Sequence, residues 1–499
     1  MLHRWQRSLG LLLIVSLQIC VMRAQESHDH PAPEKLGSVS FPISCAPAVQ
    51  QQFNRSVALL HSFAYTAAEN AFQSVAAQDP KCAMAHWGAA MAYYHPLWDP
   101  LPPATVSIGE KEIRRAEEIG SSSERERQFI HALGLIYQDA ATAPYSTRAL
   151  HYEQAMRDLA AANEKDVEAQ VFYALALIAN ASPADKTHAR QKQAVEILEP
   201  LDRAYPEHPG IPHYLIHACD NAELAEKGLP AARAYSQIAP SAPHALHMPS
   251  HIFTRLGLWD DSIASNLAAR KAAHEQGDVG EELHAMDYLV YAYLQSGRDE
   301  EAHDVVRQLQ AMPTLSSGDF KIGYAATAMP VRYAVERRRW PEAASIAPNA
   351  GAPPHVVAVA VWSRGVGLAR GGRAAEAGAE IDRLRQLEEQ LRTSGSDYWA
   401  TQTRVLKREV MAWAAQAKGK AEEAARLMRA SADDEDAIEK LPVTPGSIVP
   451  AREQLGDLLL EQNQPALALK EFQTSLVNAP GRRGALQGAA RAAGLSAKK

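Results

Sequence analysis

A set of small and aromatic residues that recurs about every 34 positions is the feature that most constrains how this chain folds. The first unit carries Tyr65, Ala68, Phe72 and Pro80. A unit near the C-terminus repeats the pattern with Leu455, Gly456, Ala468, Phe472 and Pro480. The small residues let two antiparallel helices approach closely, and the aromatic rings fill the space to the next pair. Because alternation of apolar and polar residues is nearly absent, the sequence predicts helix after helix and at most trivial strands.

On these landmarks the chain resembles the tetratricopeptide repeat (TPR) superfamily over almost all of residues 50–492. The resemblance implies an all-α fold, a right-handed TPR-like helical solenoid of about eleven helix pairs, whose first helices line a concave groove. Such a groove is expected to hold a peptide or protein ligand. We therefore divide the chain into a signal peptide (1–24), a flexible N-terminal arm (25–46), the TPR-like solenoid (47–492, with a His-rich segment at 213–287) and a C-terminal tail (493–499).

The first 24 residues have the pattern of a secretory leader. His3, Arg4 and Arg7 precede an apolar stretch from Leu9 to Met22. Ala24 is a small residue at a suitable cleavage point. No later stretch reaches the roughly 18 apolar residues of a membrane span. We expect a periplasmic or secreted protein with no membrane span after signal cleavage.

The overall charge excludes one class of partner. With 51 Lys plus Arg against 58 Asp plus Glu, the formal net charge is −7. An acidic chain without a long basic stripe is a poor binder of phosphate backbones, so we expect no nucleic-acid partner.

Cysteine usage fits an oxidising compartment. Cleavage of the leader leaves Cys45, Cys82 and Cys219. Cys45 lies just before the first helical unit and Cys82 at the start of the second, so a Cys45–Cys82 disulfide is topologically easy and would stabilise the fold by about 2–4 kcal/mol. The alternative is two buried thiols.

The histidines are concentrated in one part of the chain, where the segments HYLIHACD, HALHMPSH and EELHAMDYLVYAYL follow one another. Spacings of three and four residues place side chains on one face of a helix, as in bidentate metal binding. The candidate metal ligands are His213, His217, His244, His247, His251, His284 and Asp220.

The repeat register gives a second argument for the same residues. In the TPR superfamily, positions 2, 5, 9, 12 and 13 of the first helix face the groove, and on this register His213, His244 and His284 all fall at position 2. Neighbouring first helices lie about 8–10 Å apart, so imidazoles from adjacent helices can meet at one ion. The predicted ligand set is therefore His213 and His217 from one helix with His247 and His251 from the next.

The remaining candidates, His244, His284 and Asp220, are predicted to be additional ligands or partners of the ligating imidazoles. Pro249 is expected to open or kink a helix and to let His244 and His247 converge.

The His motifs, together with WGAAMAYYHPLW and PVTPGSIVPAREQLGDLLLE, are also similar to segments of a group of exported bacterial TPR proteins of uncharacterised role. This resemblance implies no particular reaction. Imidazole donors without thiolates favour copper or zinc, with iron as a third candidate. The sequence contains no phosphate-binding Gly-rich loop, no Gly-x-Ser-x-Gly and no His-Glu-x-x-His.

Three functional hypotheses follow. The first is an exported solenoid that binds a transition metal through its His cluster, together with a peptide or small ligand in the groove. The second is a metalloenzyme that uses the same cluster, and it requires an open coordination position and an adjacent pocket. The third is a metal-free protein-interaction scaffold, in which the imidazoles bond each other, Tyr214, Tyr288 or a peptide.

Overall fold

A computed structural model describes residues 34–97, 101–313 and 315–497 of the chain. Over these residues the secondary structure is helical and contains no strand. The helices belong to one compact unit, Lys35–Lys499. The predicted signal peptide lies outside the described residues. Among the helices that are described, none has the length and apolarity needed to cross a membrane.

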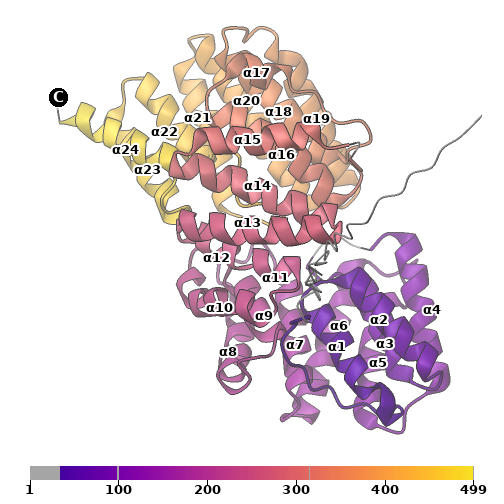
Figure 1. Ribbon diagram of the computed structural model, residues 1–499. Helices are drawn as coiled ribbons and strands as arrows, with labels where there is room; N and C mark the ends of the chain where they lie inside the picture. The colour runs from indigo at the N-terminus through magenta and orange to yellow at the C-terminus, as the bar shows by residue number, and fades with distance from the viewer. Residues whose placement is uncertain (1–33, 98–100, 314, 498–499) are drawn as a thin grey trace, which may run out of the picture. The chain divides into compact units, whose positions relative to one another are not determined.

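Over the described residues the helices form eleven consecutive pairs and one final helix. Figure 1 shows the pairs following one another along the chain. A 3-10 turn, η1 (Pro47–Val49), precedes them. The first helices of the pairs are α1 (Gln50–His61), α3 (Ala83–Tyr93), α5 (Glu124–Tyr137), α7 (Val167–Ala179), α9 (Gly210–Cys219), α11 (Pro243–His247) with α12 (Pro249–Arg255), α14 (Val279–Ser296), α16 (Phe320–Glu336), α18 (Pro354–Arg370), α20 (Asp397–Ala417) and α22 (Ala451–Glu461). The second helices are α2 (Tyr65–Gln78), α4 (Pro103–Ile119), α6 (Tyr145–Ala162), α8 (Ala189–Ala204), α10 (Ala225–Ile238), α13 (Trp259–Gln276), α15 (Asp299–Ala311), α17 (Trp340–Ser345), α19 (Ala377–Thr393), α21 (Ala421–Asp436) and α23 (Pro465–Asn478). The final helix is α24 (Arg483–Ser496).

Each first helix packs on its own second helix, and most also contact the first helix of the next pair. This succession of pairs is the arrangement of a TPR-like α-solenoid, and the predicted fold class and number of pairs are confirmed. The repeat landmarks explain the close approach of the helices. A Cβ placed on Gly88 would lie 2.3 Å from the ring of Phe72, and one placed on Gly456 would lie 2.7 Å from the ring of Phe472. Both rings are fully buried, so the glycines provide the space in which the rings pack.

The predicted flexible arm is wrong for its second half. Residues 35–46 belong to the compact unit, and Phe41 is fully buried. Its ring lies 5.0 Å from that of Phe129 and 5.4 Å from those of Phe53 and Trp87. The prediction followed the His, Pro and Ser content of residues 25–46 and overlooked Leu36, Val39 and Phe41, which are buried. The first half of the predicted arm lies outside the described residues.

The predicted C-terminal tail begins too early. Helix α24 continues to Ser496 because the backbone N–H of Ala497 still donates to the carbonyl of Ala493, at 3.1 Å. The last turn of the helix is therefore complete beyond residue 493.

The side of the helices on which the histidines lie is filled by the chain itself. Helix α1 of the first pair contacts α9 of the fifth. The loop between α21 and α22 (residues 437–450, the α21–α22 loop) reaches the first half of the chain, where the N–H of Glu439 donates to the carbonyl of Pro183 at 2.8 Å. The histidine segment therefore lies in the protein interior and not on an open groove.

Candidate metal centre

Six histidines from four helices meet in the interior. Helix α9 carries His213 and His217, α11 carries His244 and His247, α12 carries His251, and α14 carries His284. Each of these side chains is at least nine-tenths buried. These helices are the first helices of three consecutive pairs, with α11 and α12 together forming one of them. They bring the imidazoles together, as the repeat register predicts for side chains that share one face.

Pro249 interrupts the helix that carries three of these histidines. Helix α11 ends at His247, and α12 begins at Pro249, which has no N–H to continue the hydrogen-bond ladder. The interruption is as predicted, but its effect is different. His247 stays close to His251, while His244 lies beside the histidines of α9.

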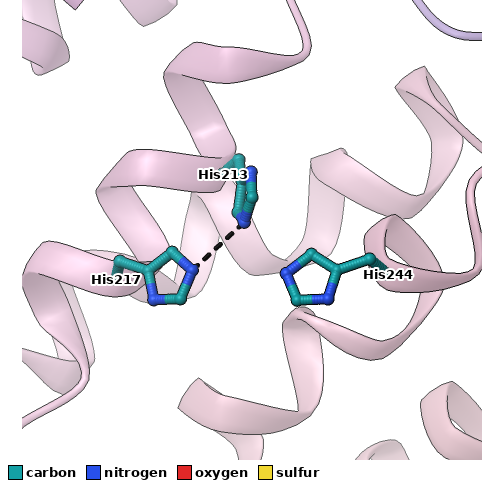
Figure 2. A group of neighbouring side chains, drawn as sticks. All are labelled: His213, His217 and His244. Atoms are coloured by element: carbon teal, nitrogen blue, oxygen red, sulfur yellow. Dashed lines mark hydrogen bonds between the residues drawn. The ribbon is translucent and has the colours of Figure 1, made fainter. Parts of the chain in front are cut away.

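The first group of three imidazoles is His213, His217 and His244 (Figure 2). One nitrogen from each ring lies within 4.8 Å of the other two. The Nε2 atoms of His213 and His217 are 3.1 Å apart. The ring of Phe63 covers this group, with its centroid 4.4 Å from that of His213.

The second group is His247, His251 and His284, and its three nitrogens also lie within 4.8 Å of one another. The Nε2 atoms of His247 and His251 are 3.0 Å apart. The ring of Tyr288 covers this group, 4.7 Å from the ring of His247 and 5.1 Å from that of His251.

Hydrogen bonds donated by the other ring nitrogen, Nδ1, fix the orientation of two imidazoles. The Nδ1–H of His213 donates to the backbone carbonyl of His61 at 2.6 Å. The Nδ1–H of His247 donates to Oδ1 of Asn266 at 2.7 Å. The amide of Asn266 is oriented by its own NH2 group, which donates to the carbonyl of Ser262 at 2.8 Å, so its oxygen faces the histidine.

Two carboxylates orient two more imidazoles. Nδ1 of His244 lies 3.2 Å from Oε2 of Glu281, and Nδ1 of His251 lies 2.9 Å from Oδ2 of Asp220. Burial opposes ionisation of Asp220, yet Lys440 and Arg255 hold its pKa well below the usual range. Lys440 lies 2.7 Å from one carboxylate oxygen and Arg255 lies 2.8 Å from the other. Asp220 is therefore a charged acceptor that directs His251, and it belongs to neither group of three imidazoles.

The hydrogen-bond acceptors next to His247 and His251 determine which ring nitrogen of each carries the hydrogen. Both Nδ1 atoms face oxygens that only accept, so in neutral rings both Nε2 atoms carry a lone pair. These lone pairs face each other across 3.0 Å. The hydroxyl of Tyr288 lies 3.4 Å from Nε2 of His251 and closer, at 3.2 Å, to the carbonyl of Thr444. Two facing lone pairs repel unless a cation lies between them.

A proton does not fill that role near neutral pH. Burial lowers the pKa of His247 well below its usual value, and the neighbouring imidazole of His284 lowers it further. Burial also lowers the pKa of His251, to about 4, despite the hydrogen bond that its Nδ1–H donates to Asp220.

The spacing of the two nitrogens suits a metal ion. Two nitrogen ligands about 2.0–2.1 Å from one zinc ion lie about 3.3 Å apart at a tetrahedral angle and about 2.9 Å apart at a right angle. The observed separations of 3.0 and 3.1 Å fall within this range. Within the described part of the chain, Nε2 of His244 and Nε2 of His284 are buried and have no hydrogen-bond partner. Each group thus contains one imidazole whose inward nitrogen is unsatisfied.

The α21–α22 loop contacts Tyr288 of α14 and Asp220 and so covers the site. The hydroxyl of Tyr288 donates to the carbonyls of Pro442 and Thr444, at 3.3 and 3.2 Å, and Lys440 contacts Asp220. A cavity of about 240 Å³ runs along this loop and reaches His217 and Asp220. A larger cavity of about 470 Å³ lies away from the histidines, between α16, α20, α22 and α24.

A third cluster, His61, Glu168 and His208, is satisfied by hydrogen bonds alone. Glu168 accepts from Nε2–H of His61 at 2.9 Å and from Nε2–H of His208 at 3.0 Å. The remaining nitrogens accept hydrogen bonds, from the hydroxyl of Tyr214 at 2.9 Å and from the N–H of Gly210 at 3.2 Å. No imidazole lone pair is left for an ion in these rings, so we interpret this cluster as structural.

The sequence-predicted residues all lie at the site, but in a different grouping. The predicted four-ligand set drew His213 and His217 together with His247 and His251, whereas the structure separates these pairs. His244 completes the first pair and His284 completes the second. Cys45 and Cys82, predicted as a disulfide, are bonded in the structure, and Cys219 is a buried thiol.

Several residues around the histidines were not found from the sequence. Glu281 lies on α14 itself, Asn266 lies on α13, Phe63 lies in the turn after α1, and Lys440 lies far away along the chain. Only Glu281 carried a usable signal, because it precedes His284 by three residues on the same helix. Lys440 adjoins the PVTPGSIVP segment, but nothing in that segment indicated a contact with Asp220.

No protein-family model matches the chain, and no curated protein sequence matches it. Solved structures similar to it include yeast Tom70, at 11% identity and a TM-score of 0.31, covering 90% of this chain and 88% of that one. The structure of Naa15/Naa10 bound to HypK-THB is similar at 10% identity and a TM-score of 0.26, covering 84% of this chain and 62% of that one. The P58(IPK) TPR domain is similar at 11% identity and a TM-score of 0.21, covering 90% of this chain and 99% of that one. Likeness at this level carries no argument about function, and the similarity to exported His-motif proteins gains no support from these comparisons.

Proposed function

We propose that this chain is an exported α-solenoid that binds a transition metal through its buried histidines. The observation that carries the proposal is the pair of Nε2 lone pairs of His247 and His251, which face each other at 3.0 Å. A cation between them removes the repulsion, and the anchored Nδ1 atoms hold both rings in place for it. The unsatisfied Nε2 atoms of His244 and His284 support the same interpretation.

The donor set favours copper or zinc, with iron as a further candidate. All six inward-facing groups are imidazoles, and the carboxylates of Asp220 and Glu281 are engaged with Nδ1 atoms and with cationic side chains. Imidazole suits copper, zinc and iron, whereas magnesium and calcium require oxygen ligands. The bound ion would supply a fixed positive charge and Lewis acidity at this point of the interior.

The metal content of the mature protein, purified without a tag from periplasm, tests the proposal. We expect near-stoichiometric copper, zinc or iron by mass spectrometry, and its loss in the His247→Ala/His251→Ala variant. The matched control is His274→Ala, because His274 is a largely exposed histidine on α13. Absence of metal in the wild type, even after incubation with each ion, would refute metal binding.

Export is part of the proposal and rests on the pattern of residues 1–24 and on the Cys45–Cys82 pairing, since disulfides persist in oxidising compartments. Its test is the mass of the protein recovered from periplasm. We expect a mass that lacks the leader and two thiol hydrogens, and full-length reduced protein in the cytoplasm would contradict export.

A second candidate function is catalysis at the same centre. The observation that favours it is the cavity of about 240 Å³ that reaches His217, since an enzyme needs room beside an open coordination position. Azide added to the copper-loaded protein is the probe. A new absorption band in the wild type, lost in a Leu97→Trp variant that fills the cavity, would support access to the ion. An unchanged spectrum would indicate a closed storage or structural site.

The scaffold hypothesis requires a partner surface away from the histidines, because their imidazoles are buried. The cavity of about 470 Å³ beside α22 and α24 is the place we assign to it. Trp340 and Trp413 line that cavity together with five arginines, Arg338 among them, and three acidic residues, and the excess of arginine suits an acidic peptide with an apolar side chain. An Arg338→Glu variant should lose such a partner while it retains any metal.

A further inference from the structure

The six histidines repeat one local arrangement twice. In each group, two imidazoles four residues apart have facing Nε2 atoms, at 3.1 Å for His213 and His217 and at 3.0 Å for His247 and His251. In each group, a third imidazole comes from the first helix of the next pair and has a buried, unsatisfied Nε2, in His244 and in His284. The two groups are thus built alike from different residues.

The two groups are in direct contact. The rings of His217 and His251, one from each group, are 5.9 Å apart, and those of His244 and His247 are 6.1 Å apart. Aromatic rings pack on both groups, Phe63 and Tyr235 on the first and Tyr288 on the second. All six imidazoles are buried, so the contact between the two groups lies in the protein interior.

One ion cannot satisfy all six nitrogens. Ligands of a single ion must lie about 2.0–2.1 Å from it, so no two of them are more than about 4.2 Å apart. The inward nitrogens instead fall into two sets of three, each set compact within 4.8 Å. A single ion in either set would leave the unsatisfied Nε2 of the other set buried.

Each group also has one carboxylate next to it. Glu281 lies beside Nδ1 of His244 in the first group, and Asp220 lies beside Nδ1 of His251 in the second. Glu281 is also paired with Lys321, as Asp220 is paired with Lys440 and Arg255. Each group therefore has its own carboxylate, which is held by cationic side chains and orients one imidazole of the group.

We infer that the site is dinuclear and holds two adjacent transition-metal ions, one on each group of three imidazoles. The inference rests on the proposed metal binding and makes it more specific. Three nitrogen ligands leave at least one coordination position for each ion, and the cavity at His217 gives a small molecule or water a route to the first of them. The chemical class is a pair of copper or zinc ions with nitrogen ligands only.

The test is metal stoichiometry in variants that disable one group at a time. His244→Ala removes the third ligand of the first group, and His284→Ala that of the second. With copper or zinc as the probe and a chelator present to remove weakly held ions, we expect two equivalents in the wild type and one in each variant. His208→Gln, in the hydrogen-bonded cluster with Glu168, is the matched buried control and should retain two.

The outcomes separate the two proposals. One equivalent in the wild type that survives in His244→Ala but not in His247→Ala/His251→Ala would leave metal binding standing and overturn the dinuclear site. One equivalent lost in both single variants would also overturn it, since a shared mononuclear site would then be present. No metal in any form would overturn both.

If a variant does not fold, the wild-type protein alone still tests the dinuclear site. The metal-free wild type is titrated with copper(I) or zinc under native mass spectrometry. We expect a final state with two ions, and a titration that ends at one ion refutes the dinuclear site.

Discussion

Replacing Glu168 by glutamine tests whether the third histidine cluster is held by charge. The carboxylate is completely buried and accepts hydrogen bonds from His61 and His208. Burial alone would raise its pKa, but the two imidazoles lower it, from 4.5 to about 2. A difference of this size corresponds to about 3 kcal/mol of folding free energy near neutral pH. Glu168→Gln should therefore lower the free energy of unfolding by about 3 kcal/mol, measured by urea titration at pH 7.

The sign of the pH dependence follows from the direction of the shift. A carboxylate whose pKa is depressed in the folded state stabilises the fold fully above its unfolded pKa of 4.5, and this contribution is lost as the pH falls towards 2. The difference between wild type and variant should therefore shrink from about pH 4.5 downwards. Bound metal should be unchanged, because this cluster offers no free nitrogen lone pair. A difference below about 1 kcal/mol at pH 7, or one that does not change with pH, would refute the reasoning.

Three further predictions concern the packed segment, the disulfide and one anchor of the site. Phe41→Ala should lower the free energy of unfolding, measured in urea, by about 3–5 kcal/mol. Val477→Ala, at an exposed position, should have almost no effect. Equal effects of the two substitutions would mean that the segment before α1 is not packed. Cys45→Ser should cost about 2–4 kcal/mol, and reductant should then have no further effect on the unfolding midpoint, in contrast to the wild type. Asn266→Ala removes the acceptor for Nδ1–H of His247 and should weaken metal binding about 10- to 100-fold in a chelator competition without changing the stoichiometry. An unchanged affinity would show that the amide does not orient the ring.

The fold could be predicted from the sequence because its determining contacts are local. Phe72 packs into the space left by Gly88, and Phe472 packs into the space left by Gly456. Each of these pairs spans only the turn between two neighbouring helices, so a periodic sequence pattern records it. The packing of Phe41 left no such periodic pattern in the sequence, since its partners Phe53, Trp87 and Phe129 come from three different helices.

The candidate ligands could likewise be found from local spacings in the sequence, but their division into two groups of three could not. Spacings of four residues brought out His213 with His217 and His247 with His251. The placement of His244 depends on how the chain turns at Pro249, which the sequence indicates only as a break. The closure of the site by Lys440 depends on a loop more than 200 residues further along the chain, and no helical periodicity reports a contact of that kind.

The energetic consequence of the histidine cluster argues that it serves binding and not stability. Five of the six imidazoles have lowered pKa values, for which burial is the first cause. Below pH 6.5 each of them binds a proton more readily in the unfolded chain, and each then destabilises the metal-free fold by about 1.4 kcal/mol per pH unit. Six apolar side chains of similar volume would avoid this penalty and would leave no Nε2 atom unsatisfied. Asn266, Glu281, Asp220 and the carbonyl of His61 nevertheless direct four of the rings inward. That orientation has a physical purpose if cations occupy the space the rings face, and the same cations would offset the penalty by stabilising only the folded chain.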